Sequence, residues 1–169
     1  MIGKLLNYFY LKVYQNGRVL YRQQQEISFR EKYSINVSFR FNGENILFYG
    51  DGSIICGRNS YIGELSTVLA CDGCKVEIGN NCSISHNVRI YTQSKTADQD
   101  FSKSSLINKA NVIIEDYAWI GANVFINPGV VIGKNSIVGA NSVITKNVPM
   151  NAIFGGVPAK LIRMKSSNA

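Results

Sequence analysis

Histidine, tryptophan and proline are scarce in this sequence, and their scarcity excludes several kinds of site. The 169 residues include one histidine, one tryptophan, three prolines and four cysteines. The cysteines contain one CxxC pair, Cys71–Cys74, whereas a structural zinc site needs a second such pair or accompanying histidines. The lone histidine, His86, does not adjoin that pair. We therefore expect no metal site, and cysteines that stay free in a reducing, cytoplasmic compartment.

The sequence also lacks a segment that would span a membrane or direct secretion. Its most apolar stretch, LLNYFYLKVY, is interrupted by Lys12 and preceded by Lys4. A transmembrane helix needs about 20 apolar residues, and no small-residue cleavage site follows the stretch. We expect residues 1–30 to form a cap segment, with helix as one option, over the first coil of the fold. The alternative is a basic segment that lies on an anionic membrane surface, at the inner face of the membrane.

Positive charge exceeds negative charge, but its distribution argues against a nucleic-acid partner. Lys and Arg number 18 against 11 Asp and Glu, which gives a net charge of +7. The basic residues gather toward the two ends of the chain instead of along one stripe, and no nucleic-acid-binding motif is present. The phosphates of a small cofactor or a membrane surface account for the surplus equally well. We expect no nucleic-acid partner.

One period dominates the C-terminal half of the chain. Aliphatic residues recur every six positions, at Ile114, Ile120, Ile126, Ile132, Val138 and Ile144. A small or branched residue follows each by four, at Ala118, Val124, Val130, Ser136, Ser142 and Val148. A period of six suits neither a helix nor an alternating strand, but it suits a coil of three short strands with the aliphatic residue inside. The repeat predicts an all-β parallel β-helix with three hexads per coil.

The same spacing extends upstream and defines the domain. It runs through Cys56, Ile62, Val68, Ile78, Ile84 and Ile90, with one interval of ten residues between Val68 and Ile78. Residues 94–109 are polar and lack the period, which predicts a loop that leaves the prism. We expect the β-helix to cover residues 31–156 with this excursion at 94–109, followed by a C-terminal fold-back and tail at 157–169.

Three short elements near the C-terminus carry a family resemblance. They are Ala118-Trp119-Ile120-Gly121, Thr145-Lys146 and Gly156-Val157-Pro158-Ala159-Lys160. With the repeat, they resemble the left-handed β-helix acyltransferases, in particular sugar O-acetyltransferases related to maltose and galactoside acetyltransferase and those that modify bacterial capsule and O-antigen sugars. The resemblance implies a left-handed β-helix that assembles as a homotrimer, with acetyl-CoA as acyl donor in the groove between two neighbours.

The resemblance also implies which residues bind acetyl-CoA. Trp119 would offer a flat apolar face at the reactive end of the pantetheine arm. Ala122 and Ala140 are small residues that would let the amides of the arm approach the backbone. Hydroxyl and cationic groups for the nucleotide and its phosphates would come from Thr145, Lys146, Lys160 and Arg163.

The acceptor side departs from the family pattern. In these enzymes a histidine takes the proton from the sugar hydroxyl that attacks the thioester. The run Ile90-Tyr91-Thr92-Gln93-Ser94 matches the approach to that histidine, but the next residue is Lys95. A lysine base needs a pKa lowered toward neutrality, and the nearby Asp98 and Asp100 favour the charged form. His86 is the second candidate for the base, at an outward corner half a coil from Lys95.

These observations predict an acetyltransferase that moves an acetyl group from acetyl-CoA to a sugar hydroxyl in surface polysaccharide biosynthesis. Two alternatives stay open. An amino group on a nucleotide-linked sugar needs no strong base, so N-acetylation of an amino sugar would explain the missing histidine. The other alternative is a catalytically silent trimer that binds CoA or a sugar.

Overall fold

The computed structural model describes residues 2–166, so residues 167–169 of the expected tail lie outside the described range. The chain divides into two units, residues 1–32 and 33–169. The first unit is one helix, α1 (Ile2–Lys32). No proline interrupts it, and Arg30 and Lys32 in its last turn suit the negative end of the helix dipole. Whether this helix caps the first coil stays a prediction.

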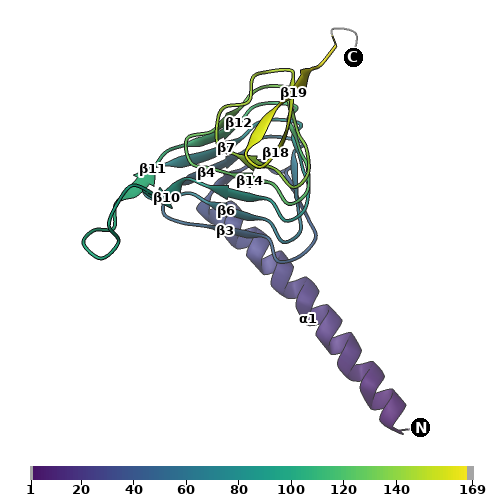
Figure 1. The fold of residues 1–169 in the computed structure, drawn as a ribbon. Coiled ribbons are helices and arrows are strands. Elements are labelled where there is room, and N and C mark those ends of the chain that lie inside the picture. The colour runs from purple at the N-terminus through teal and green to yellow at the C-terminus, as the bar shows by residue number, and fades with distance from the viewer. Residues whose placement is uncertain (1, 167–169) are drawn as a thin grey trace. The chain divides into compact units, whose positions relative to one another are not determined.

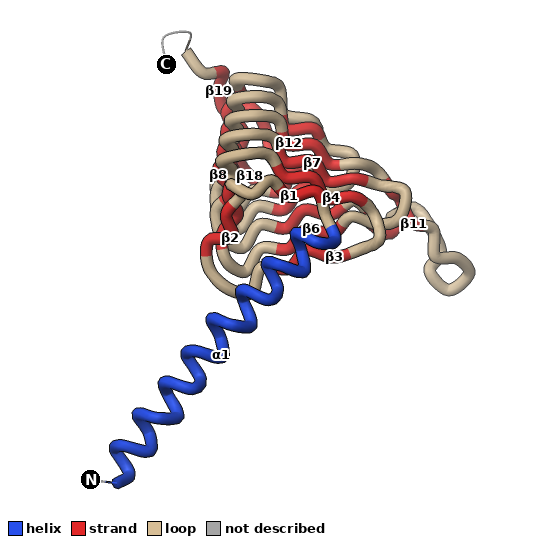
Figure 2. The backbone as a smooth tube through the Cα atoms, turned by 180° about the vertical axis from the view of Figure 1, so that it is seen from behind, coloured by secondary structure: helices blue, strands red, loops and turns tan. Residues whose placement is uncertain are grey.

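The second unit is a three-sided prism whose sides are parallel sheets (Figures 1 and 2). Sheet A contains β1 (Ser34–Ile35), β4 (Ser53–Cys56), β7 (Lys75–Ile78), β12 (Val112–Ile114) and β15 (Val131–Ile132). Sheet B contains β2 (Arg40–Asn42), β5 (Tyr61–Gly63), β8 (Ser83–Ile84), β13 (Trp119–Ile120), β16 (Ile137–Val138), β18 (Ala152–Gly156) and β19 (Ala159–Met164). Sheet C contains β3 (Leu47–Tyr49), β6 (Thr67–Leu69), β9 (Arg89–Tyr91), β14 (Phe125–Ile126) and β17 (Val143–Ile144).

Each coil passes through sheets A, B and C in that order, and we name the turns between them corners AB, BC and CA. The predicted left-handed parallel β-helix is confirmed. In the C-terminal coils Ile114 pairs with Ile132, eighteen residues further on, as three hexads require. In the N-terminal coils Cys56 pairs with Ile78. The four extra residues of the ten-residue interval therefore lengthen one turn at corner CA, and the strands of the next coil pair in the same register as before.

The core consists of the side chains that the repeat selects. All six aliphatic residues from Ile114 to Ile144 are at most 1% exposed, and the residues four positions later are at most 2% exposed. Each buried aliphatic side chain contributes about 1.5–3 kcal/mol through removal from water. Ser136 and Ser142 are buried too, and their hydroxyls donate to the carbonyls of Gly133 and Gly139 at 2.6 and 2.7 Å. A small side chain at this position thus fills the interior and satisfies a turn carbonyl.

Asparagine ladders hold the corners. In corner BC the Asn123 side-chain amide donates to Asn141 at 2.9 Å and accepts from Asn87 at 2.8 Å. All three have φ near +55°, a conformation that asparagine tolerates better than most residues. Gly121 is needed for a different reason, because a Cβ there would lie 2.5 Å from the backbone nitrogen of Ala140 in the next coil.

Two segments depart from the coil. A hairpin leaves corner CA and is formed by the antiparallel strands β10 (Gln93–Lys95) and β11 (Ile107–Lys109) (Figure 1). At the C-terminal end, β19 folds back antiparallel to β18 and extends sheet B by one strand. Within residues 2–166, no helix has both the length and the apolar character needed to cross a bilayer.

The corner ladder can be tested at Asn123. We expect Asn123→Ala to lower the free energy of unfolding by about 1–3 kcal/mol, because it removes two ladder hydrogen bonds and puts a Cβ without polar compensation at positive φ. Asn123→Gly keeps the backbone conformation accessible and should cost less. Urea unfolding followed by circular dichroism measures both. Equal losses for the two variants would contradict a conformational role for asparagine.

Candidate functional site

Corner CA is built around Thr92, a buried residue directly before the hairpin. Its hydroxyl accepts from the backbone N–H of Cys71 at 2.8 Å and donates to the carbonyl of Leu69 at 3.1 Å. Its own carbonyl accepts from the N–H of Ala110 at 2.9 Å, where the chain returns from the hairpin. Thr92 therefore ties both ends of the hairpin to the longer corner of the preceding coil.

Lys95 is the last residue of β10 and is exposed on the hairpin. Its ammonium lies 5.4 Å from the centroid of the Phe101 ring, a cation–π contact within the hairpin. Asp100 is engaged with other partners than Lys95. Its carboxylate accepts a hydrogen bond from the Ser102 hydroxyl and lies 2.9 Å from the Lys103 ammonium. Hydrogen bonds from the Ser102 hydroxyl, the Lys103 side chain and the Ser102 backbone N–H lower the pKa of Asp100. Asp100, one of the two acidic residues of the hairpin, is thus engaged away from Lys95.

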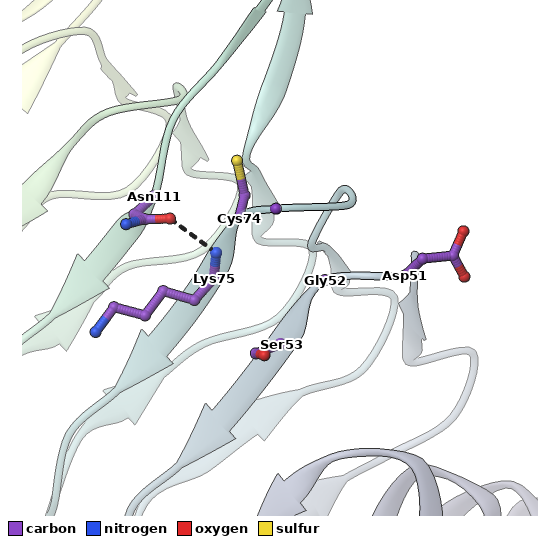
Figure 3. Close-up of a pocket in the computed structure, with 7 residues that line it drawn as sticks. Asp51, Gly52, Ser53, Cys74, Lys75 and Asn111 are labelled. Carbon is purple, nitrogen blue, oxygen red and sulfur yellow. Dashed lines mark hydrogen bonds between the residues drawn. The ribbon is translucent and has the colours of Figure 1, made fainter.

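A hollow of about 380 Å³ lies at corner CA on the N-terminal side of the hairpin (Figure 3). We call it the CA hollow, and it is lined by Asp51, Gly52, Ser53, Gly73, Cys74, Lys75 and Asn111. The side-chain oxygen of Asn111 accepts from the backbone N–H of Lys75 at 2.8 Å, which fixes one wall. Burial and the neighbouring Cys71 thiol raise the pKa of the Cys74 thiol, so this cysteine is a neutral wall group.

Corner BC holds a second set of predicted residues in one column. Backbone hydrogen bonds link the turns of successive coils: Asn123 N–H donates to the carbonyl of His86, and Asn141 N–H donates to that of Ala122. His86, Ala122 and Ala140 therefore stand above one another along the prism. His86 is exposed, and its Nδ1 lies 3.4 Å from the Ser85 hydroxyl. Because alanine has a short side chain, Ala122 and Ala140 project little from corner BC in the two coils that follow His86.

The outer face of sheet B carries Trp119, whose side chain is 54% exposed. Strand register places Trp119 beside Ile137, Ile137 beside Ile153, and Ile153 beside Arg163 on the fold-back strand. We call these four residues the sheet B row. Since adjacent strands are about 4.8 Å apart, the row spans about 14 Å from an indole to a guanidinium. Lys160, paired with Gly155, lies on the same strand as Arg163.

The predicted residues therefore fall into two groups within one chain. Trp119, Ala122, Ala140, Lys160 and Arg163 lie on sheet B or corner BC, and His86 joins them there. Lys95, Thr145 and Lys146 lie at corner CA, on the other side of sheet C. Within one chain, Thr145 and Lys146 therefore lie at corner CA, whereas Lys160 and Arg163 lie on sheet B.

Comparison with known proteins agrees with this architecture. The family model "Bacterial transferase hexapeptide (six repeats)" matches residues 111–146. A maltose O-acetyltransferase from Clostridium difficile is 31% identical, with a TM-score of 0.71 over 86% of this chain and 76% of that one. The chain belongs to the hexapeptide-repeat transferases.

Two further members of the hexapeptide-repeat transferases show related chemistry. A Vibrio cholerae hexapeptide-repeat acetyltransferase, solved in complex with acetyl-CoA, is 28% identical with a TM-score of 0.72, over 86% of this chain and 79% of that one. The polysialic acid O-acetyltransferase of Escherichia coli O1:K1 is 39% identical over 130 residues, which are 76% of this chain. The present chain spans 42% of that relative's length.

Sequence reasoning missed three parts of this site. The role of Thr92 is signalled in the sequence only by the long interval after Val68, which makes the Cys71 corner that Thr92 anchors. The CA hollow combines residues of three coils, so no local pattern reveals it. The sheet B row depends on the register of the fold-back strand, which the repeat does not specify. Among residues 2–166 no cluster of three His, Cys, Asp or Glu side chains could hold a metal.

The anchoring role of Thr92 can be tested with an isosteric change. Thr92→Val removes the acceptor of the Cys71 N–H, and we expect a loss of about 1–3 kcal/mol in the free energy of unfolding. Hydrogen exchange should speed up at Cys71 and at the base of the hairpin. Thr92→Ser keeps the hydroxyl and is the control. If Thr92→Val left exchange at the hairpin unchanged, the hydroxyl would not anchor it.

Proposed function

We propose that this protein transfers the acetyl group of acetyl-CoA to a hydroxyl group of a sugar. The observation that supports this most directly is the sheet B row. A solvent-exposed indole, two aliphatic side chains and a guanidinium in line over about 14 Å form a surface suited to a long ligand that is apolar at one end and anionic at the other. The acetyl-CoA complex of the Vibrio cholerae relative supports the choice of donor.

The residues on sheet B and corner BC fit this donor. In the proposed arrangement the indole of Trp119 contacts the acetyl end, and the pantetheine arm follows the sheet B row. The short side chains of Ala122 and Ala140 leave the backbone of corner BC accessible, so the amides of the arm can reach backbone groups. Lys160 and Arg163, both exposed on β19, provide positive charge for the phosphates.

A complete site in this proposal requires a second copy of the chain. Lys95 and the CA hollow lie at corner CA, whereas Trp119 lies on sheet B and Ala122 at corner BC. A homotrimer, in which corner CA of one copy faces sheet B of the next, brings the two groups together three times by symmetry. Thr145 and Lys146 then reach the donor from the neighbouring copy.

The proposed reaction needs one proton transfer. The acceptor hydroxyl attacks the thioester carbonyl, a new C–O bond forms, the C–S bond breaks, and CoA leaves as the thiol with the proton that the hydroxyl has lost. Lys95 marks the acceptor side of this site, on the hairpin that leaves the same corner as the CA hollow. His86 stands in the same column as Ala122, so it is the alternative base on the donor side. The acceptor is proposed to be a sugar of a surface polysaccharide.

One observation favours a second candidate function. Lys95, which the family resemblance aligns with the histidine, is exposed and lies 5.4 Å from the centroid of the Phe101 ring. An amino sugar brings its own nucleophile and can be acetylated by positioning alone. N-acetylation of an amino sugar is therefore the second candidate, and a CoA-binding trimer without catalysis is the third.

Donor binding can be measured by calorimetry. We expect wild-type protein to bind acetyl-CoA, and Arg163→Glu to weaken binding by about 10- to 100-fold, because a charge-assisted contact is lost and a repulsion is added. Arg58→Glu, an equal charge change at corner AB, is the matched control. If wild-type protein failed to bind acetyl-CoA, the transferase proposal would be wrong.

Acceptor chemistry can be measured by thiol release on a panel of sugars and amino sugars. For a hydroxyl acceptor, we expect Lys95→His to preserve or raise turnover, because it restores a base that titrates near neutral pH. His86→Gln tests the alternative base in the same assay. Release on amino sugars alone would favour N-acetylation, whereas donor binding without release on any acceptor would indicate the silent trimer.

A further inference from the structure

The helix α1 has a large exposed apolar surface that the proposed reaction does not use. Its exposed side chains include ten large apolar or aromatic residues, each 47–67% exposed: Leu6, Tyr8, Phe9, Tyr10, Leu11, Val13, Tyr14, Val19, Leu20 and Tyr21. A helix in water normally turns such residues toward a partner. The density of these side chains over sixteen consecutive positions indicates that this surface is covered by something when the protein works.

The charge of the helix identifies what kind of surface would cover it. Residues 2–25 contain four basic residues, Lys4, Lys12, Arg18 and Arg22, and no acidic residue. The first acidic residue is Glu26, which lies 3.7 Å from Arg22. The covering surface should therefore be apolar in its interior and anionic at its edge.

The two kinds of side chain are arranged for such a surface. At 100° per residue, Leu6, Phe9, Val13 and Leu20 fall on one stripe of the helix. Lys4, Arg18 and Arg22 fall on the opposite side, together with one apolar residue, Leu11. The tyrosines lie largely between them, and Lys12 and Arg18 stand over the rings of Tyr8 and Tyr14 at 5.7 and 5.6 Å. Aromatic rings flanked by basic groups are typical of the boundary between water and lipid.

We infer that α1 binds the surface of an anionic lipid bilayer and lies in the plane of the interface. The stripe of Leu6, Phe9, Val13 and Leu20 enters the headgroup region, the tyrosine rings lie at its level, and the basic side chains face anionic lipid headgroups. The helix does not cross the bilayer, in agreement with its charge and moderate hydropathy. This inference is independent of the acyl transfer reaction.

A second copy of the chain is the other partner to consider, and the sequence favours it less. Apolar residues recur every seven positions at Leu6, Val13, Leu20 and Ile27, as in a coiled-coil seam. However, the intervening seam positions 16 and 23 are Asn and Gln, and the partner helices would bring basic groups together without acidic groups near them. Most of the tyrosines would also remain in water.

The test is co-sedimentation of the full chain with vesicles. We expect binding to phosphatidylcholine vesicles with about 30 mol% phosphatidylglycerol, weak binding to pure phosphatidylcholine, and loss of binding in high salt. Lys4→Glu/Lys12→Glu should lower the partition coefficient at least about tenfold. Arg58→Glu/Lys134→Glu, with the same charge change on the prism, should bind as wild type. Phe9→Ser/Leu20→Ser should lose binding, and its thermal unfolding should show an intact prism.

Three results would overturn the inference. Wild-type protein that stays in the supernatant with both vesicle types does not bind membranes. Equal binding to neutral and anionic vesicles would show that the helix charges do not contribute to binding. The same conclusion would follow if Arg58→Glu/Lys134→Glu lost as much binding as Lys4→Glu/Lys12→Glu. Absence of vesicle binding together with assembly that Phe9→Ser/Leu20→Ser abolishes would show that the helix packs on other copies of itself.

Discussion

The narrow interior of the prism is the constraint on which the rest of the structure depends. It accepts one aliphatic side chain per hexad and a small residue four positions later, so the chain turns every six residues and each coil stacks on the last in fixed register. Stacking in turn sorts outward-facing residues into columns and rows. Trp119, Ile137 and Ile153 are separated in sequence yet form a continuous surface, because the core leaves their strands only one way to pair.

The same constraint explains which features could be predicted from sequence. The buried positions and the single slip after Val68 both follow from the spacing, since each is a local response to the interior. The hairpin strands, the anchoring by Thr92 and the CA hollow depend on contacts between residues in different coils, and the row ending at Arg163 depends on an antiparallel return. A six-residue period specifies neither the contacts between coils nor the antiparallel return of the chain.

The predicted site residues are divided between two parts of the prism. The residues proposed to bind the donor occupy sheet B and corner BC, where backbone ladders and the fold-back strand hold them. Lys95 belongs instead to a hairpin tied to the prism through Thr92 and Ala110. The hairpin strands form a sheet of their own, so in the proposed function the acceptor side is structurally separate from the donor side.

The central claim, that donor and acceptor groups come from neighbouring copies, is tested most directly by mixing two variants, Trp119→Ala and Lys95→Glu, each impaired alone, in one preparation. If sites form between copies, random trimers pair an intact Trp119 with an intact Lys95 at about a quarter of their interfaces. Thiol release should recover toward that fraction of wild-type activity. Activity that stays at the level of the separate variants would show that each chain contains its whole site.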